Sequence, residues 1–355
     1  MSFSEISTES ELRKIIGQVP SSIKIKIIKS LEKNSTTFLE NYNYLVLGSF
    51  GFTSNALVFG KSVAKVEVID TATLKIHYPI DSTEPLANEN IPCSIFVLVG
   101  NIEESLRLNG YITQSTSELN GYTSVIFSMD ELYLHCAKSV KRSQFWQPRE
   151  TSINHNEGIT QINHTEPVVK SYLEQTPFLL LLTQDAEGNT DLSPRGDPQG
   201  FVKYLDNDTL LLPERPGNRL ADSLTNVIHN STMAVLCVIP GTSLFLTIKG
   251  EAKLTHSKSL LAECSVQNKA PKVGFVLTIK ETYFGFSEMI NVTKIWDKSE
   301  HPDRSILPSF GTMITEQIQS AGKLPKEKSF LGKMVGKVTS SATDAVIKSD
   351  YKKLY

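Results

Sequence analysis

Residues 191–226 read DLSPRGDPQGFVKYLDNDTLLLPERPGNRLADSLTN, and the rest of the chain is best interpreted around this stretch. Ser193 and Arg195 alternate, so a strand would place both side chains on one face of a sheet. A second short strand is predicted at residues 209–212. The turn-forming loop 213–219 follows it, and residues 221–224 read as the start of a helix. The stretch therefore predicts two strands, a loop and a helix start.

The polar side chains of this stretch suit a phosphate dianion. Arginine side chains supply paired charged donors, and hydroxyl and amide groups add neutral ones. The candidate phosphate-binding residues are Ser193, Arg195, Arg215, Asn218, Arg219 and Ser223. Taken alone, the stretch is equally compatible with a surface loop that carries solvated arginines.

Composition describes an ordinary globular chain. The 355 residues are 40% hydrophobic and 21% charged, and this length favours two domains. A net charge of -2 gives no support to nucleic-acid binding. The four cysteines lie far apart without CxxC spacing, which is typical of reduced packing cysteines and of no metal site. This cysteine pattern predicts a cytoplasmic protein. No apolar run approaches the roughly 20 residues of a membrane span.

Short strands dominate the first half of the chain. A capping pattern predicts a helix through residue 16, and apolar spacing predicts another over residues 22–39. Eight strands are predicted at residues 44–47, 56–59, 63–69, 73–77, 94–99, 105–113, 124–127 and 131–135. The Gly, Asn and Pro residues between these strands indicate tight turns, and therefore an antiparallel barrel or sandwich.

The same order of segments returns after a linker. Residues 38–47 match 172–181, residues 105–112 match 245–252, and Trp146 matches Trp296. We interpret the chain as two diverged copies of one β-barrel. The predicted division is a first barrel with a helical lead-in at 1–150, a linker at 151–168, a second barrel at 169–320 and a helical tail at 321–355.

The two copies differ where chemistry is expected. When the two copies are aligned, Leu57 and Phe59 of the first correspond to Ser193 and Arg195 of the second. The first copy instead carries a basic segment, LHCAKSVKRSQFW at residues 134–146, and the second copy has Glu288 where this segment has a lysine. The candidate residues of the segment are His135, Lys138, Lys141 and Arg142. Each copy thus carries half of a basic, phosphate-friendly site.

With both halves in view, the chain resembles the pyridoxamine 5'-phosphate oxidase-related family of FMN-binding split barrels. The motifs are SPRGDP at 193–198, RPGNRLADSL at 215–224, and HCAK at 135–138 with RS and W after it. The resemblance implies a mainly β fold with flanking helices, in which two tandem split barrels form a pseudo-dimer. It also implies one FMN site that takes the six candidates of the second copy and the four of the first. The opposite site, with Leu57, Phe59, Phe286 and Glu288, is expected not to bind.

The resemblance implies an FMN-dependent oxidoreductase whose substrate and electron donor the sequence does not specify. It assigns no catalytic residue, although His135 or Lys138 is a candidate cation for stabilising reduced flavin. Two alternatives stay open: a flavin-binding stress or carrier protein without turnover, and a scaffold that has lost the cofactor. We expect a monomeric pseudo-dimer or a higher homo-oligomer, with no membrane span. An apolar stripe in the lysine-rich tail predicts a docking helix.

Overall fold

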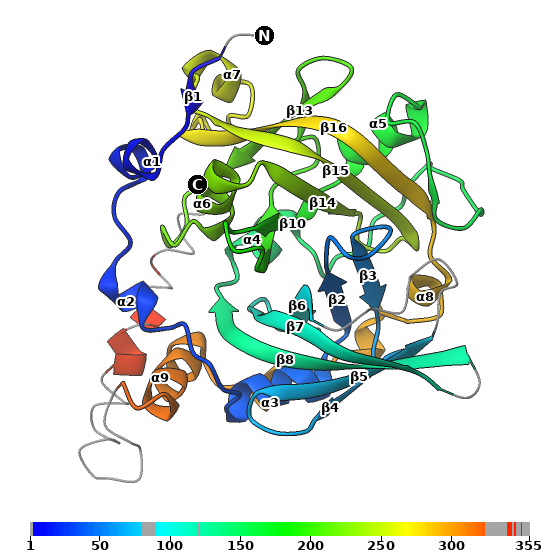
Figure 1. The fold of residues 1–355 in the computed structure, drawn as a ribbon, viewed down its shortest axis with the longest axis vertical. Helices are drawn as coiled ribbons and strands as arrows, with labels where there is room; N and C mark the ends of the chain where they lie inside the picture. The colour runs from blue at the N-terminus through cyan, green and yellow to red at the C-terminus, as the bar shows by residue number, and fades with distance from the viewer. Residues whose placement is uncertain are drawn as a thin grey trace.

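The chain folds into two curled antiparallel sheets that lie one above the other (Figure 1). The computed structural model describes residues 3–79, 90–118 and 121–323, with residues 339–342, 344, 345 and 349. Most of the predicted helical tail lies outside the described residues. Within them, no helix is long and apolar enough to cross a membrane.

The first sheet has seven strands in the order β3-β2-β6-β7-β8-β5-β4. Their bounds are β2 (Tyr44–Gly48), β3 (Ala56–Phe59), β4 (Lys65–Val68), β5 (Thr73–Pro79), β6 (Ile91–Leu98), β7 (Ser105–Ser117) and β8 (Tyr122–His135). The two strands predicted at 124–127 and 131–135 are one strand, β8. A register shift at Gly110 on the neighbouring β7 keeps the two strands paired along this length.

The second sheet repeats that order as β11-β10-β14-β15-β16-β13-β12. Its strands are β10 (Phe178–Gln184), β11 (Thr190–Gly196), β12 (Lys203–Tyr204), β13 (Thr209–Glu214), β14 (Thr232–Val238), β15 (Leu244–Thr255) and β16 (Val273–Phe286). Two short strands extend it: β1 (Glu5–Ile6) pairs with β15, and β9 (Thr160–Gln161) pairs with β16.

The long hairpin of each sheet has its bulge at a matching glycine. Gly110 of β7 and Gly250 of β15 both lie at a register shift. A Cβ atom at either glycine would collide with a carbonyl oxygen of the facing strand, that of Ser128 or Thr278. The predicted fold class is therefore confirmed, and the structure repeats one topology. Descent of the two halves from one duplicated domain stays an inference.

Helices flank the sheets. They are α1 (Glu9–Ile16), α2 (Ser21–Lys24), α3 (Lys33–Asn41), α4 (Lys138–Ser143), α5 (Pro167–Gln175), α6 (Asp222–His229), α7 (Lys258–Ala262), α8 (Glu288–Asn291) and α9 (Phe310–Ser320). The prediction of one helix over residues 22–39 is wrong. Ile28 forms a β-bridge with Leu132, and the amide of Leu31 donates to the carbonyl of Thr71. These bonds hold the segment between α2 and α3 against the first sheet.

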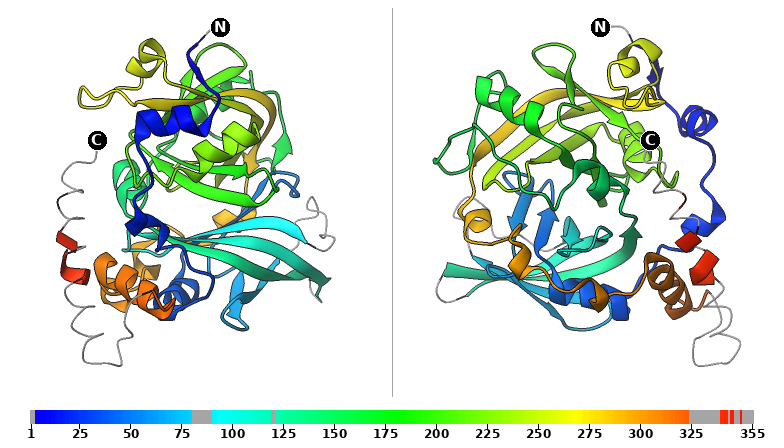
Figure 2. Two further views of the ribbon diagram at one scale, coloured as in Figure 1. Left: turned by 60° about the vertical axis from the view of Figure 1, so that its left-hand side comes forward. Right: turned by 180° about the vertical axis from the view of Figure 1, so that it is seen from behind.

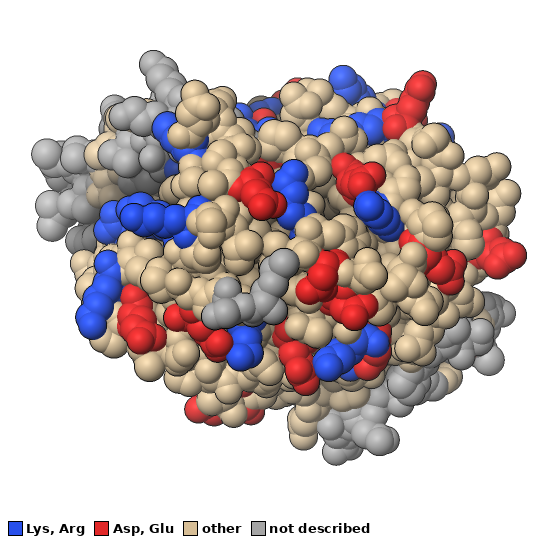
Figure 3. Space-filling view, turned by 90° about the horizontal axis from the view of Figure 1, so that it is seen from above, with Lys and Arg blue, Asp and Glu red and all other residues tan. Residues whose placement is uncertain are grey.

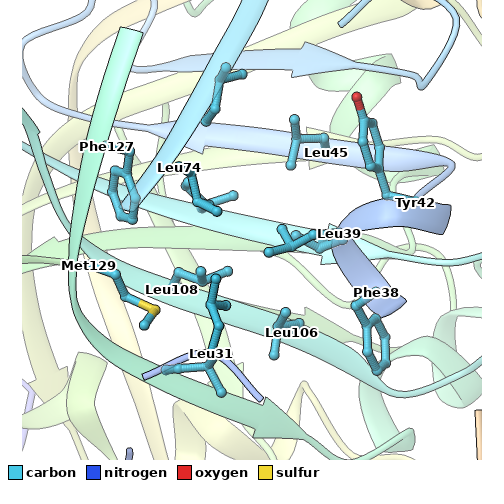
Figure 4. Close-up of a cluster of buried hydrophobic side chains, with 14 of the residues drawn as sticks. Leu31, Phe38, Leu39, Tyr42, Leu45, Leu74, Leu106, Leu108, Phe127 and Met129 are labelled. Carbon is cyan, nitrogen blue, oxygen red and sulfur yellow. The ribbon is translucent and has the colours of Figure 1, made fainter. Parts of the chain in front are cut away.

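Each sheet encloses an apolar core, and a third core lies between the sheets. Figure 4 shows part of the first core, in which Phe38 and Leu39 of α3 face Leu106 and Leu108 of β7. Phe145 and Phe178 meet in the third core, with ring centroids 4.8 Å apart in an edge-to-face arrangement. The two barrels are therefore joined by a packed aromatic interface.

The ends of the chain cross between the barrels. Leu12 of α1 is buried in the second core, although α1 precedes the first barrel in the sequence. Met313 of α9 is buried in the first core, although α9 follows the second barrel. Figure 2 shows α1 beside the second sheet before the chain descends to α2. The predicted division at residue 150 does not capture this exchange.

Candidate functional site

A cavity of about 600 Å³ lies where the two barrels meet. The first barrel contributes α4 and the ends of β7 and β8, and the second contributes β11, the end of β13, the loop 215–221 and the start of α6. Nine of the ten predicted residues line it: His135, Lys138, Arg142, Ser193, Arg195, Arg215, Asn218, Arg219 and Ser223. The tenth, Lys141, is not among the lining residues and pairs with Glu103. Their shared position is a finding, whereas their role in cofactor binding stays a prediction.

Strand β11 supplies the wall of the cavity by simple alternation. Leu192 packs into the core between the barrels, so Ser193 and Arg195 face the other way. The Nε atom of Arg195 lies 2.7 Å from the Glu214 carboxylate, and Nη2 donates to the Ser223 hydroxyl at 2.9 Å. The Ser193 hydroxyl donates to Asp191 at 2.6 Å. It would therefore have to change partner to donate to a ligand.

Side chains of the loop 215–221 fix it by hydrogen bonds to the residues around it. Arg215 is buried, with Nε 2.6 Å from Asp197 and Nη2 donating to the Cys264 carbonyl at 2.7 Å. The amide nitrogen of Asn218 donates to the Tyr133 hydroxyl of the first barrel at 2.7 Å. Arg215 therefore mainly fixes the loop, and Asn218 ties the loop to the other barrel.

Arg107, which is not among the predicted residues, joins the barrels beneath the cavity. This β7 side chain is 1% exposed and pairs with Asp191, Asp222 and Glu131. Its Nη2 atom lies 2.7 Å from Glu131 and 3.0 Å from Asp222. Burial by itself would lower the pKa of Arg107, but the three carboxylates raise it, so the side chain stays charged.

A sequence signal for Arg107 existed. An arginine inside an apolar strand such as SLRLNGYI is buried only where carboxylates neutralise it. Thr247 of β15 is the residue of the second copy that is equivalent to Arg107. The hydroxyl of Thr247 donates across the interface to the Ser54 carbonyl at 2.8 Å. Both positions thus bridge the barrels, but only one carries a charge. Other lining residues that are not among the predicted residues are Ile16, Cys136, Asp222, Lys269 and Lys272.

The surroundings of His135 favour its neutral form. Burial, and then the nearby charges of Arg107 and Arg195, lower its pKa well below 6.5. Its ring meets the ring of Tyr133 edge-on at 4.9 Å. The Nε2 atom is buried and has no hydrogen-bond partner within the described part of the chain. Burial therefore disfavours the charged form of His135, one of the two candidate cations, and the role of Lys138 stays a prediction.

The lining is strongly basic although the chain is slightly acidic. Eight lysine and arginine side chains line the cavity against three aspartate and glutamate side chains, whereas the whole chain has a net charge of -2. Elsewhere the charges mix: Figure 3 shows acidic and basic side chains interspersed on the face at the top of Figure 1. The cavity therefore favours an anionic ligand.

One short helix of each barrel packs on a strand of the other barrel. Helix α4 of the first barrel packs on β11, and α8 of the second packs on β3. Gly196 at the end of β11 allows the close approach of Ser139, as Gly60 just after β3 does for Thr293. On the α8 side, Phe59 is fully buried with its ring 5.0 Å from that of Tyr78. This side thus shares the packing but has no arginine on its strand.

The family comparison concerns the second barrel, which carries β11 and the loop. Residues 165–285 match the family model described as pyridoxamine 5'-phosphate oxidase. This part of the chain is similar to that family. The match supports the resemblance that the SPRGDP and RPGNRLADSL motifs indicate, and the family includes flavin-binding oxidoreductases. No curated protein matches the chain.

Several solved structures are similar to about a third of the chain. HupZ of Group A Streptococcus is 14% identical, with a TM-score of 0.28, over 33% of this chain and 94% of that chain. A putative pyridoxamine 5'-phosphate oxidase from Lactobacillus delbrueckii is 18% identical, with a TM-score of 0.28, over 34% and 97%. General Stress Protein 26 from Bacillus anthracis is 11% identical, with a TM-score of 0.26, over 33% and 89%. With TM-scores this low, these likenesses carry no statement about function.

Proposed function

We propose that the protein is an FMN-binding flavoprotein and oxidoreductase with one cofactor site between its two barrels. One observation carries the proposal. A basic cavity of about 600 Å³ gathers nine predicted residues from both halves of the chain, within a fold whose second half matches an oxidase family model. Cavities of this size are ordinary for cofactors.

The donor set fits a phosphate-bearing cofactor. Arg219 lines the cavity, and no carboxylate of the described residues pairs with its side chain. Ser223 accepts from Arg195, which leaves its own hydroxyl proton available to an anion. Arg195 and Arg215 already share their charge with Glu214 and Asp197. We therefore assign the phosphate mainly to Arg219 and Ser223, and a supporting role to the two paired arginines.

The buried imidazole offers a different contact. The surroundings of His135 favour its neutral form, and its Nε2 atom has no partner among the described residues. A cofactor or substrate that presents one polar group would satisfy this atom, which otherwise costs about 1–3 kcal/mol. Tyr133 fixes the ring edge-on, so the imidazole needs little rearrangement. FMN, when bound, would supply the redox chemistry, and the chain would orient it and exclude water.

The opposite side supports a single site. Leu57 and Phe59 of β3 are buried in the first core, where they offer no donor to a phosphate. Thr247 stands there in place of Arg107, and Glu288 stands in place of a lysine. A carboxylate beside a phosphate is repulsive. We infer that this side no longer binds a flavin.

Purification and denaturation test the cofactor. The protein is expected to be yellow, or to bind added FMN at micromolar concentration, and to release FMN and not FAD on denaturation. A colourless protein that fails to bind added FMN would reject the proposal and favour the scaffold alternative.

Reduction distinguishes an enzyme from a carrier. Bound flavin that NADH or NADPH reduces, and that then reoxidises, would support an oxidoreductase. Flavin that is bound but resists both donors would favour the stress or carrier alternative. No dinucleotide motif is visible in the sequence, so both donors are tested.

A further inference from the structure

One edge of the cavity is built by the segment that precedes the first barrel. Strand β1 pairs with β15 of the second sheet, with Glu5 opposite Thr255 and Ile6 opposite Leu254. A capping box of Thr8 and Glu11 fixes the start of α1, whose last residue, Ile16, lines the cavity. The N-terminal segment is therefore part of the site, although it lies far in the sequence from the lining residues of the second barrel.

Arg13 of α1 makes two hydrogen bonds to the loop that carries Arg219. Its Nη1 atom donates to the carbonyl oxygen of Arg219 at 2.7 Å, and Nη2 donates to that of Leu220 at 3.1 Å. The two nitrogens of a guanidinium form a rigid fork, so they fix the relative position of two successive carbonyls. A lysine could not hold both in the same way.

The loop needs such support because two of its residues are strained. Arg219 and Ala221 both have φ of 65°, in the left-handed region that residues with a Cβ atom rarely adopt. Such conformations persist only where the surrounding structure holds them. Between them, the amide of Leu220 donates to Asn218 Oδ1 at 2.9 Å. Arg13 thus binds the carbonyls of the same segment whose amide Asn218 binds.

The end of α1 also touches the Arg219 side chain. Gly17 ends the helix with φ of 85°, and a Cβ atom added there would lie 3.3 Å from Nη1 of Arg219. The guanidinium of Arg219 therefore lies against the residue that follows α1. Both the backbone and the side chain of Arg219 are placed by the N-terminal helix.

We propose that Arg13 is a positioning residue of the cavity, which holds residues 219–220 so that Arg219 stays in the cavity wall and binds a phosphorylated ligand. The nature of that ligand, FMN, rests on the proposed function. The positioning itself does not, so it can be tested without any ligand.

Tryptic cleavage of the ligand-free chain tests the positioning. Trypsin cuts after arginine, and the Arg219–Leu220 bond is held by Arg13, so mass spectrometry can follow this one cleavage. Arg13→Ala is expected to speed it about threefold or more, because local opening becomes easier. Lys14→Ala is the matched control: it removes the next, exposed cation of the same helix and should cleave at the wild-type rate.

A wild-type cleavage rate in Arg13→Ala would overturn the proposal. If Arg13→Ala is cut at many sites because it does not fold, Arg13→Lys decides, since it keeps the charge and the helix but loses the fork. Selective acceleration at Arg219 in the lysine variant supports the proposal. Cleavage at the wild-type rate there contradicts it.

A double-mutant cycle tests the link to ligand binding. Arg13→Ala should weaken FMN binding about three- to tenfold and leave riboflavin, which lacks the phosphate, unaffected. In an Arg219→Ala background, the same change should have no further effect. Equal, independent losses in both backgrounds would show that Arg13 does not act through Arg219. If the wild-type chain fails to bind FMN, the proposed function is rejected and the cleavage result alone decides the role of Arg13.

Discussion

Arg107 of the first barrel lies 3.0 Å from the carboxylate of Asp222, the residue that begins α6 in the second barrel. The same guanidinium pairs with the buried Asp191 of β11. One side chain thus joins the long hairpin of one barrel to β11 and α6 of the other. Burial also raises the pKa of Asp222 to about 6, although Arg107 opposes this rise.

Removal of Arg107 should therefore be costly. Arg107→Ala is expected to lower the free energy of unfolding by about 3–5 kcal/mol, because it leaves a buried carboxylate without its cation. Urea denaturation measures this. Lys75→Ala is the control, since Lys75 pairs with Glu118 at 3.7 Å on the surface and should cost less than about 1 kcal/mol. Equal stability of the two variants would contradict the role of Arg107.

Acid should destabilise the folded chain through His135. Its folded-state pKa lies below 6.5, so the unfolded chain binds more protons between the two values, and stability falls as the pH drops below about 6.5. His135→Gln removes this contribution. We expect the variant to lose less stability than the wild type between pH 7 and pH 5. The exposed His256→Gln should behave as the wild type, and an identical loss in all three proteins would refute the prediction.

Close packing at Gly196 should be essential for barrel docking. A Cβ atom there would collide with the carbonyl oxygen of Ser139 at the start of α4. Gly196→Ala is expected to cost about 1–3 kcal/mol in urea denaturation and to weaken FMN binding. At Gly158 an added Cβ meets no atom within 4 Å, so Gly158→Ala should change neither quantity. A silent Gly196→Ala variant would show that α4 does not dock as described.

Affinity should distinguish the two sides of the pseudo-dimer. Arg219→Ala is expected to raise the Kd for FMN about tenfold to a hundredfold, as the loss of a charge-assisted bond of about 1.5–3 kcal/mol implies. Phe59→Ala should leave the Kd unchanged but cost about 3–5 kcal/mol of stability, because Phe59 is fully buried. Isothermal titration of folded variants measures the Kd, and urea denaturation measures the stability. A comparable loss of affinity in the two variants would overturn the assignment of a single site.

The sequence predicted which residues line the cavity better than it predicted how the segments between strands and helices run. The candidates came from two local motifs whose residue types already suit a phosphate, and nine of the ten line one cavity. Lys141 could not be separated from Lys138, because both lie in one short helix and only tertiary packing pairs Lys141 with Glu103. His135 and Lys138 were equal candidates for a cation, because the desolvation of His135 and the nearby Arg107 and Arg195 are not visible in the sequence.

Local sequence patterns did not predict the contacts between segments that lie far apart in the chain. Arg13 reads as an ordinary cation at the end of an amphipathic helix, and nothing near it in the sequence points to residues 219–220. Residues 25–32 were predicted as helix because their isoleucine spacing is helical, but Ile28 pairs with β8 instead. Tertiary hydrogen bonds decide such segments, and these bonds depend on the assembled sheet.

The most direct test of the account is the stoichiometry of FMN binding. The intact chain is titrated with FMN while the quenching of flavin fluorescence is followed, at protein concentrations well above the Kd. The account predicts a break at one FMN per chain, because the strand arginine and the basic helix meet on one side of the pseudo-dimer only. A break at two FMN per chain would contradict it, since the side with Leu57 and Phe59 would then still bind.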